Sequence, residues 1–187
     1  MKIETERLIL RDLMKSDAKD IQENINNVKV SEFLLVVPHP YSIVDANSFI
    51  KNAIKAANKK PRKDYTFGIE LKSKQLVIGV FGISNVSEFE GTCSMGYWLG
   101  EKYWQQGLMT EAFIAALNFV FNSLQLRRVN VYAFAENEAS NNLIKKMGFK
   151  FEGVGRKSHR DKATGNIHDD NFYGLLKEEW LQNTNTI

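Results

Sequence analysis

The stretch of sequence that decides the fold is Gly96-Tyr97-Trp98-Leu99-Gly100-Glu101-Lys102-Tyr103-Trp104-Gln105-Gln106-Gly107-Leu108-Met109-Thr110-Glu111-Ala112. It predicts a strand that runs through a short loop directly into a helix. The first turn of a helix leaves backbone N–H groups unpaired, and the helix dipole places partial positive charge there. Such a junction can hold a pyrophosphate by backbone contacts alone, and Gly107 permits close approach. The same glycine could also serve only to turn strand into helix.

Length and composition exclude several classes of protein. A chain of 187 residues with 43% apolar residues fits one domain with its own core. Its 25 basic and 22 acidic residues leave a net charge of +3, too small for a dedicated nucleic-acid binder. The single cysteine, Cys93, excludes an internal disulfide and a cysteine-rich zinc site. A Gly-Lys-Ser/Thr ending and a Gly-x-Gly-x-x-Gly run are both absent, which argues against a nucleotide triphosphatase.

Hydrophobic periodicity gives the order of elements outward from this stretch. We expect strands at residues 8–13, 65–71, 75–84, 92–99, 127–134, 150–160 and 169–176. We expect helices at about 16–25, 42–57, 107–123 and 138–147, the first capped by Ser16 and the second by Ser42 with Asp45. The order β-α-α-β-β-β-α-β-α-β-β predicts an α+β fold, with about seven strands in a mixed, mostly antiparallel sheet and about four helices. We expect one domain over residues 1–187, its core at about 7–177 and a tail that frays after Trp180.

Several motifs in this order resemble one family. The run Trp104-Gln105-Gln106-Gly107-Leu108-Met109 resembles the Arg/Gln-x-x-Gly-x-Gly/Ala signature of the GNAT superfamily of acetyl-coenzyme A (acetyl-CoA)-dependent N-acetyltransferases. Further stretches resemble its branch of ribosomal-protein N-terminal acetyltransferases, the Rim-type enzymes: residues 6–11, 137–149, 152–153 and 165–169. The resemblance covers nearly the whole chain and implies the GNAT fold.

Three positions depart from the family pattern. Trp104 stands where the signature has Arg or Gln, and Met109 where it has Gly or Ala. Backbone contacts to the cofactor therefore carry over better than side-chain contacts. Related sequences often place a glutamate on the strand that enters Gly-Tyr-Trp-Leu, whereas this chain has Ser94, which cannot serve as a carboxylate base.

The resemblance implies a set of residues that bind acetyl-CoA. It assigns the strand residues Trp98 and Leu99 to the pantetheine amides and the thioester oxygen, and Asn137 to the pantetheine arm. It assigns the pyrophosphate to the amides of the loop and helix start, namely Gln105, Gln106, Gly107, Leu108, Met109 and Thr110.

Two residues are candidates for proton transfer. Ser140 stands where the Rim-type branch places a serine proposed to protonate the coenzyme A thiolate, although Ser140 and Asn137 could instead only cap a helix. His159 stands at about the position of a carboxylate near the acceptor, and a histidine pKa of about 6.5 suits a base. A solvent-facing His159 without a role is the alternative. His168 and Asp169 are adjacent in a strand, so a direct dyad between them is not expected.

The branch predicts transfer of an acetyl group to the N-terminal α-amine of a protein, by direct attack in a ternary complex. About 14% of an α-amine is neutral at pH 7, some 400-fold more than of a lysine amine, so an α-amine needs less help from a base. A small-molecule amine acetyltransferase and a non-catalytic acyl-CoA sensor are the alternatives. We expect no metal, membrane or specific nucleic-acid partner, a cytoplasmic location, and a monomer or homodimer.

Overall fold

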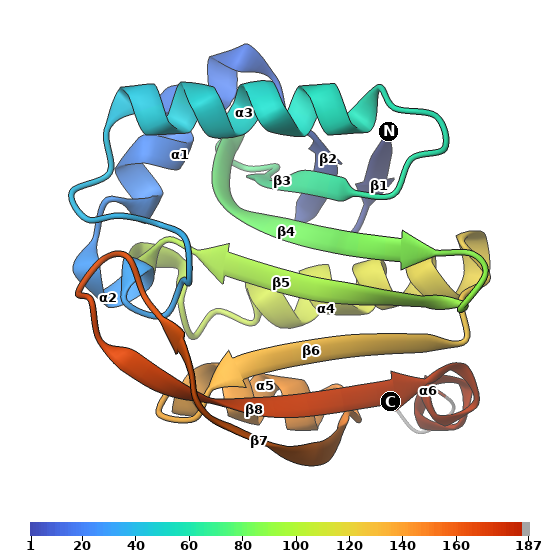
Figure 1. The fold of residues 1–187 in the computed structure, drawn as a ribbon. Helices are drawn as coiled ribbons and strands as arrows, with labels where there is room; N and C mark the ends of the chain where they lie inside the picture. Colours follow the sequence, from blue (N-terminus) through green and yellow to red (C-terminus); the bar gives the residue numbers. More distant parts are fainter. Residues whose placement is uncertain (185–187) are drawn as a thin grey trace.

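The computed structural model describes residues 1–184, and within them a single sheet of eight strands forms the centre of the molecule (Figure 1). The strands are β1 (Lys2–Glu4), β2 (Leu8–Asp12), β3 (Tyr65–Leu71), β4 (Leu76–Ser87), β5 (Thr92–Leu99), β6 (Arg128–Phe134), β7 (Lys150–Arg160) and β8 (Ile167–Leu176). Their spatial order is β1-β2-β3-β4-β5-β6-β8-β7. Every neighbouring pair is antiparallel except β5 and β6, which run parallel. The predicted α+β class and the mostly antiparallel sheet are confirmed.

Helices cover both faces of the sheet. The front face carries α1 (Ala18–Ile25) and α3 (Ile43–Ala57), with the single turn α2 (Val28–Ser31) beside them. The back face carries α4 (Leu108–Asn118), which continues as a π-helical turn over Phe119–Ser123, and α5 (Glu138–Lys146). Among residues 1–184, none of the helices combines the length and apolar character needed to cross a bilayer.

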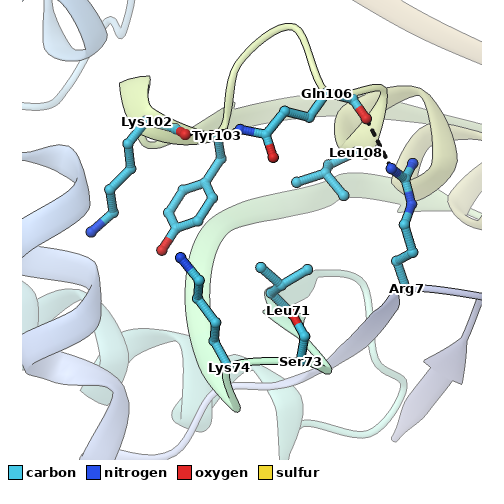
Figure 2. Close-up of a pocket in the computed structure, with 8 residues that line it drawn as sticks. All are labelled: Arg7, Leu71, Ser73, Lys74, Lys102, Tyr103, Gln106 and Leu108. Carbon is cyan, nitrogen blue, oxygen red and sulfur yellow. Dashed lines mark hydrogen bonds between the residues drawn. The ribbon is translucent and has the colours of Figure 1, made fainter.

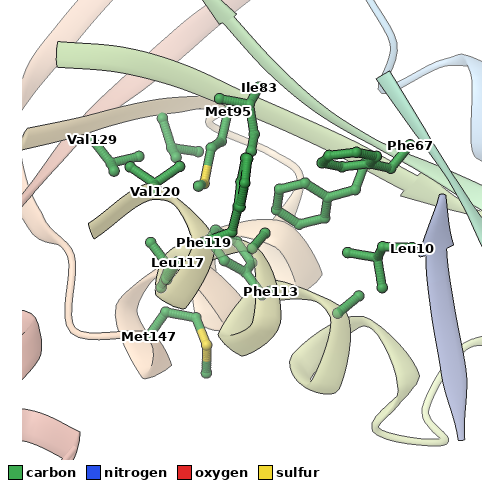
Figure 3. Packing of buried hydrophobic residues seen from close by; sticks show 14 of the residues in the cluster. Leu10, Phe67, Ile83, Met95, Phe113, Leu117, Phe119, Val120, Val129 and Met147 are labelled. Atoms are coloured by element: carbon green, nitrogen blue, oxygen red, sulfur yellow. The ribbon is translucent and has the colours of Figure 1, made fainter. Parts of the chain in front are cut away.

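The back face contains the larger apolar core (Figure 3). Phe113 of α4 is fully buried, and its ring packs edge-to-face against two rings of the sheet. Its ring centroid lies 5.2 Å from that of Phe81 of β4 and 5.1 Å from that of Tyr97 of β5. Such edge-to-face pairs add to the free energy gained by burying the rings. The core therefore fixes α4 against β4 and β5, and with it the loop that leads from β5 into α4.

Three short elements were not expected from the sequence. β1 is only three residues long and pairs with β2, and α2 is one turn long with an Asn27 side-chain cap that accepts the Lys29 amide. The residues from Lys177, expected as a fraying tail, form α6 (Lys177–Thr184) instead. Burial of the Trp180 side chain, 1% exposed, in the back core holds this helix against the sheet.

The predicted caps had different outcomes. Ser42 caps α3 and exchanges hydrogen bonds with Asp45, as expected. The prediction for Ser16 was wrong, because Ser16 lies inside a 3₁₀ turn over Lys15–Asp17 that precedes α1. Asp17 closes that turn, since its carboxylate accepts the Met14 amide at 2.7 Å.

Candidate active site

β5 and β6 separate halfway along their length. They pair from Thr92 with Arg128 to Met95 with Val131, and beyond these residues no pairing continues between the two described strands. Figure 1 shows the two strands diverging toward their carboxyl ends. Gly96–Leu99 of β5 and Tyr132–Phe134 of β6 therefore lie beyond the last paired residues of the two strands. We call these two segments the parted strand ends.

The alternation of backbone groups decides which β5 amides face the parted ends. The Gly100 amide donates to Ile78 O on the β4 side. Since successive residues of a strand point their amides to opposite sides, the N–H groups of Tyr97 and Leu99 face away from β4, toward β6. Trp98 is in register with Val80, and its backbone N–H and C=O groups face β4. Of the two strand residues assigned to the cofactor, only Leu99 presents its backbone amide to the parted ends.

Two residues of the loop after β5 have left-handed backbone conformations before α4 begins. Gln105 has φ 58° and Gly107, the residue before the first turn of α4, has φ 72°. Only glycine adopts this conformation without strain. No side chain caps α4, so the amides of Leu108, Met109 and Thr110 have neither an intrahelical acceptor nor a capping side chain. The loop and helix start can therefore bind an anion through backbone N–H groups.

A clamp between Arg7 and Glu111 holds this loop in place. The Arg7 guanidinium donates to Gln106 O at 2.9 Å and to the Glu111 carboxylate at 2.6 Å. Thr5 Oγ1 and the Arg7 amide donate to the same carboxylate. Burial acts to raise the pKa of Glu111, but these hydrogen bonds outweigh it and lower the pKa. The carboxylate is therefore charged near neutral pH and ties the β1–β2 turn to the first turn of α4.

A hollow of about 330 Å³ lies on the outer side of the loop (Figure 2). Its lining residues come from the β1–β2 turn, the end of β3, the β3–β4 turn, the loop and the start of α4, and they are Arg7, Leu71, Ser73, Lys74, Lys102, Tyr103, Gln106 and Leu108. The ammonium groups of Lys74 and Lys102 lie 5.3 Å and 5.2 Å from the centre of the Tyr103 ring. With no acidic side chain in the lining, the hollow adds positive charge beside the loop.

Asn137 and Ser140 lie on the back face at the start of α5. The Asn137 side chain accepts the Ser140 amide at 3.1 Å and so caps the helix. The Ser140 hydroxyl lies 2.9 Å from the Tyr97 hydroxyl of β5, just beyond the point where β5 and β6 part. Burial raises the pKa of the Tyr97 phenol, and the hydrogen bond with Ser140 opposes this only partly. Tyr97 therefore stays protonated and keeps its hydroxyl in a hydrogen bond with Ser140.

Asn141, one residue later, is 5% exposed and holds the turn before α5. Its amide nitrogen donates to Phe134 O at 2.9 Å and to Asn137 O at 2.8 Å. Its amide oxygen accepts from the Tyr173 hydroxyl at 2.7 Å and from Asn171 at 2.9 Å, both on β8. The positions of Asn137 and Ser140 therefore depend on a buried polar network that joins β6, α5 and β8.

His159 lies on the opposite, front face of the sheet. Its ring stacks on Tyr132 of β6 with centroids 5.8 Å apart, and its Nδ1 hydrogen-bonds the Asp170 carboxylate of β8. Tyr132 is the first β6 residue past the last pair with β5, and it is 45% exposed. His159 thus borders the parted strand ends from the front, whereas Ser140 borders them from the back.

His168 and Asp169 form no dyad with each other, as expected. His168 is 6% exposed, with Asp161 at 2.9 Å from its Nε2 and Glu136 at its Nδ1. Burial acts to lower the pKa of His168, but the two carboxylates outweigh it and raise the pKa. Asp169 instead accepts the Lys157 amide at 2.7 Å. His168 therefore fixes the corner between β6 and α5 to the β7–β8 turn.

The departures from the family signature have visible consequences. The Trp104 indole N–H donates to Leu99 O at 2.8 Å, so this side chain occupies one backbone acceptor at the end of β5. Ser94 faces the front with Asn130 in register on β6, and the two residues provide no carboxylate there. Tyr97, Tyr132 and Asp170 were not singled out from the sequence, because their roles depend on contacts between distant elements.

Comparisons with known proteins agree with this arrangement. A family model described as the acetyltransferase (GNAT) domain matches residues 7–150. The chain is 31% identical to the uncharacterized N-acetyltransferase YoaA of Bacillus subtilis, over 94% of this chain and 96% of YoaA. It is also 31% identical to the ribosomal protein uS5-alanine N-acetyltransferase of Escherichia coli, over 49% of this chain and 48% of that protein.

A solved structure shares the fold. The microcin C7 self-immunity acetyltransferase MccE, solved in complex with acetyl-CoA and AMP, superposes with a TM-score of 0.78 at 23% identity. The match covers 92% of this chain and 93% of that one. The expected architecture, built on a parted pair of strands, is therefore that of a known acetyltransferase fold.

Proposed function

The chain belongs to the GNAT acetyltransferase family, whose members use acetyl-CoA as the acetyl donor, and from this premise we propose that it acetylates the N-terminal α-amine of a protein. The observation that carries the proposal is that two groups able to transfer protons, Ser140 and His159, border the parted strand ends from opposite faces. Direct attack by an amine needs a proton acceptor on the amine side and a proton donor on the thiolate side.

The residues present fit acetyl-CoA. The amides from Gln105 to Thr110 would hold the pyrophosphate at the start of α4, with Gly107 in the left-handed conformation that their arrangement needs. The Leu99 amide and the Tyr97 backbone would pair with the pantetheine arm, and Asn137 would contact the same arm from α5. When bound, acetyl-CoA supplies an activated acetyl group as a thioester.

The proton transfers are divided between the two faces. His159 Nε2 accepts the proton that the attacking amine loses as its nitrogen bonds to the thioester carbon. Ser140 donates its hydroxyl proton to the sulfur as the carbon–sulfur bond breaks, while its oxygen stays hydrogen-bonded to the protonated Tyr97 hydroxyl at 2.9 Å. The protons balance over one turnover, because His159 releases the amine proton to solvent and solvent restores the proton that Ser140 gave to the thiolate.

The absence of a side chain at Gly96 supports access of a polypeptide end to the front face. Gly96 is exposed beside the parted ends, and a Cβ placed there would meet no atom within 4 Å. An α-amine is the easier substrate here, because Ser94 replaces the carboxylate that a lysine amine would need most. Similarity across 49% of this chain to an enzyme named for acetylating a ribosomal protein supports the same acceptor class, and we propose a cytoplasmic location with it.

Thiol release with a panel of acceptors tests the proposal. The panel contains peptides with a free N-terminus, the same peptides with a blocked N-terminus and an internal lysine, and small amines. Cys93, the only cysteine, is 1% exposed and adds little background thiol. We expect turnover with free N-termini alone. Turnover restricted to small amines would make the chain a small-molecule acetyltransferase, and tight acetyl-CoA binding without any turnover would make it an acyl-CoA sensor.

Ser140→Ala tests the acid side of the mechanism. We expect kcat to fall by about 10²-fold or more, because the thiolate loses its proton donor, while the Kd for acetyl-CoA changes little. Ser48→Ala, the same change at an exposed serine of α3, is the matched control. An unaltered kcat in Ser140→Ala would remove Ser140 from the mechanism.

A further inference from the structure

Asp170 is a fully buried carboxylate on the front face. Its side chain lies on β8, and its Oδ1 atom has no hydrogen-bond partner within residues 1–184. Its Oδ2 atom accepts from Ser158 at 2.6 Å and from His159 Nδ1. A buried carboxylate with an unpaired oxygen costs free energy, so stability does not explain why it is there.

A bulge in β7 brings His159 to Asp170. Gly155 is in register with Asp170 and His159 with His168, so the three residues 156–158 of β7 lie opposite Asp169 alone. Lys157 takes a left-handed conformation at φ 49°, and the Asp169 carboxylate accepts its amide. Bulges of this kind re-aim a side chain within a sheet. Here the His159 ring lies against Asp170 of β8 and stacks on Tyr132 of β6, the strand that borders the parted ends.

We propose that Asp170 is a positioning residue for His159, holding the ring in the tautomer that keeps the Nε2 lone pair free for the acceptor amine. A carboxylate without a proton can only accept, so the hydrogen must lie on Nδ1. The ring is 36% exposed, and its Nε2 has no partner among the hydrogen bonds of the described residues. This inference rests on the proposed function, because it presumes that His159 receives the amine proton.

The surroundings of His159 support the assignment. Tyr132 stacks on the ring from β6, Asp170 meets it from β8, and His168 lies in register across the strand pair. His168 is already held by Asp161 and Glu136, so Asp170 is the carboxylate that serves His159. When the amine proton reaches Nε2, the ring becomes an imidazolium, and the Asp170 charge stabilises it at Nδ1.

Asp170→Asn tests the role without changing the size of the side chain. The asparagine NH₂ can donate to Nδ1 and would move the ring proton to Nε2, where it blocks the lone pair. We expect kcat to fall by about 10²-fold or more with an unchanged Kd for acetyl-CoA. Asp169→Asn is the matched control, because an amide oxygen can still accept the Lys157 amide; we expect its kcat to stay within about threefold of the wild type.

A readout independent of turnover keeps the proposal separate from the proposed function. Nitrogen NMR of ¹⁵N-histidine-labelled protein reports the ring tautomers, the chain has three histidines, and the loss of one signal in His159→Gln assigns His159. We expect the proton on Nδ1 in the wild type and on Nε2 in Asp170→Asn. A proton on Nε2 in the wild type, or an unchanged tautomer in the variant, would overturn the role of Asp170. Absence of turnover in the wild type would instead refute the proposed function.

Discussion

Replacing Asn141 by alanine tests whether the buried network before α5 holds both the fold and the site. The Phe134 and Asn137 carbonyls each keep a backbone donor, so each loses only one of two hydrogen bonds, worth about 1 kcal/mol. The Tyr173 hydroxyl, on a side chain 2% exposed, loses the oxygen to which it donates, at about 1–3 kcal/mol. Alanine returns about 0.5 kcal/mol of helix propensity. With about 1 kcal/mol for each of the two carbonyls, the net loss is about 2.5–4.5 kcal/mol.

Thermal unfolding by calorimetry measures this loss. For a chain of this size, each kcal/mol lost from the free energy of unfolding lowers the Tm by about 2–4 °C. The Tm of Asn141→Ala should therefore fall by about 5–15 °C. Asn142→Ala is the control, because Asn142 is exposed on the same helix and its Tm should change by less than about 2 °C. Turnover should also fall in Asn141→Ala, since Asn137 loses its support. Equal Tm values for the two variants would refute the reasoning.

Two further changes probe other parts of the molecule. Gly107→Ala should lower the free energy of unfolding by about 1–2 kcal/mol and weaken coenzyme A binding, measured by calorimetry, by about tenfold. The cause is the φ of 72° at this residue. Crowding is not the cause, because a Cβ there would meet its nearest atom at 3.5 Å. Gly96→Ala, in open space, should keep its affinity, and equal losses would argue against a backbone cause. His168→Gln should lose stability mainly at low pH: the raised pKa of His168 stabilises the fold fully below about pH 6.5 and less as the pH rises through the folded value. Denaturant unfolding at pH 6 and pH 9 measures this, and a constant difference from the wild type would contradict it.

The sequence predicted best those elements whose limits are set by local chemistry. The bounds of β3 and β5 agree with prediction because turn residues flank a period-2 pattern on both sides. The cap of α3 was found because Ser42 and Asp45 have capping-box spacing. Ser16 misled the prediction, because a serine before an apolar stripe does not reveal that a 3₁₀ turn comes first.

Contacts between distant elements could not be predicted from local chemistry. The hydrogen bond between His159 and Asp170 depends on the bulge in β7. The residue pattern of the strand does not indicate which of its residues are left unpaired. Asn141 was not singled out from the sequence, because its burial depends on how α5 packs against β8. Strand alternation would have sufficed to assign the Tyr97 amide to the parted ends, had the pairing with β4 been known.

The alternation of β8 explains how one strand serves both faces of the site. Asp170 points to the front and holds His159, while its neighbour Asn171 points to the back and donates to Asn141, which supports Asn137 and Ser140. Residues one apart in a strand face opposite sides of the sheet, so a shift of β8 by one register would exchange these roles. The proposed base, His159, and the proposed acid, Ser140, are therefore both positioned by the register of β8. In this chain, the pairing of β8 with both β6 and β7 therefore keeps Asp170 and Asn171 on the faces where these two contacts are made.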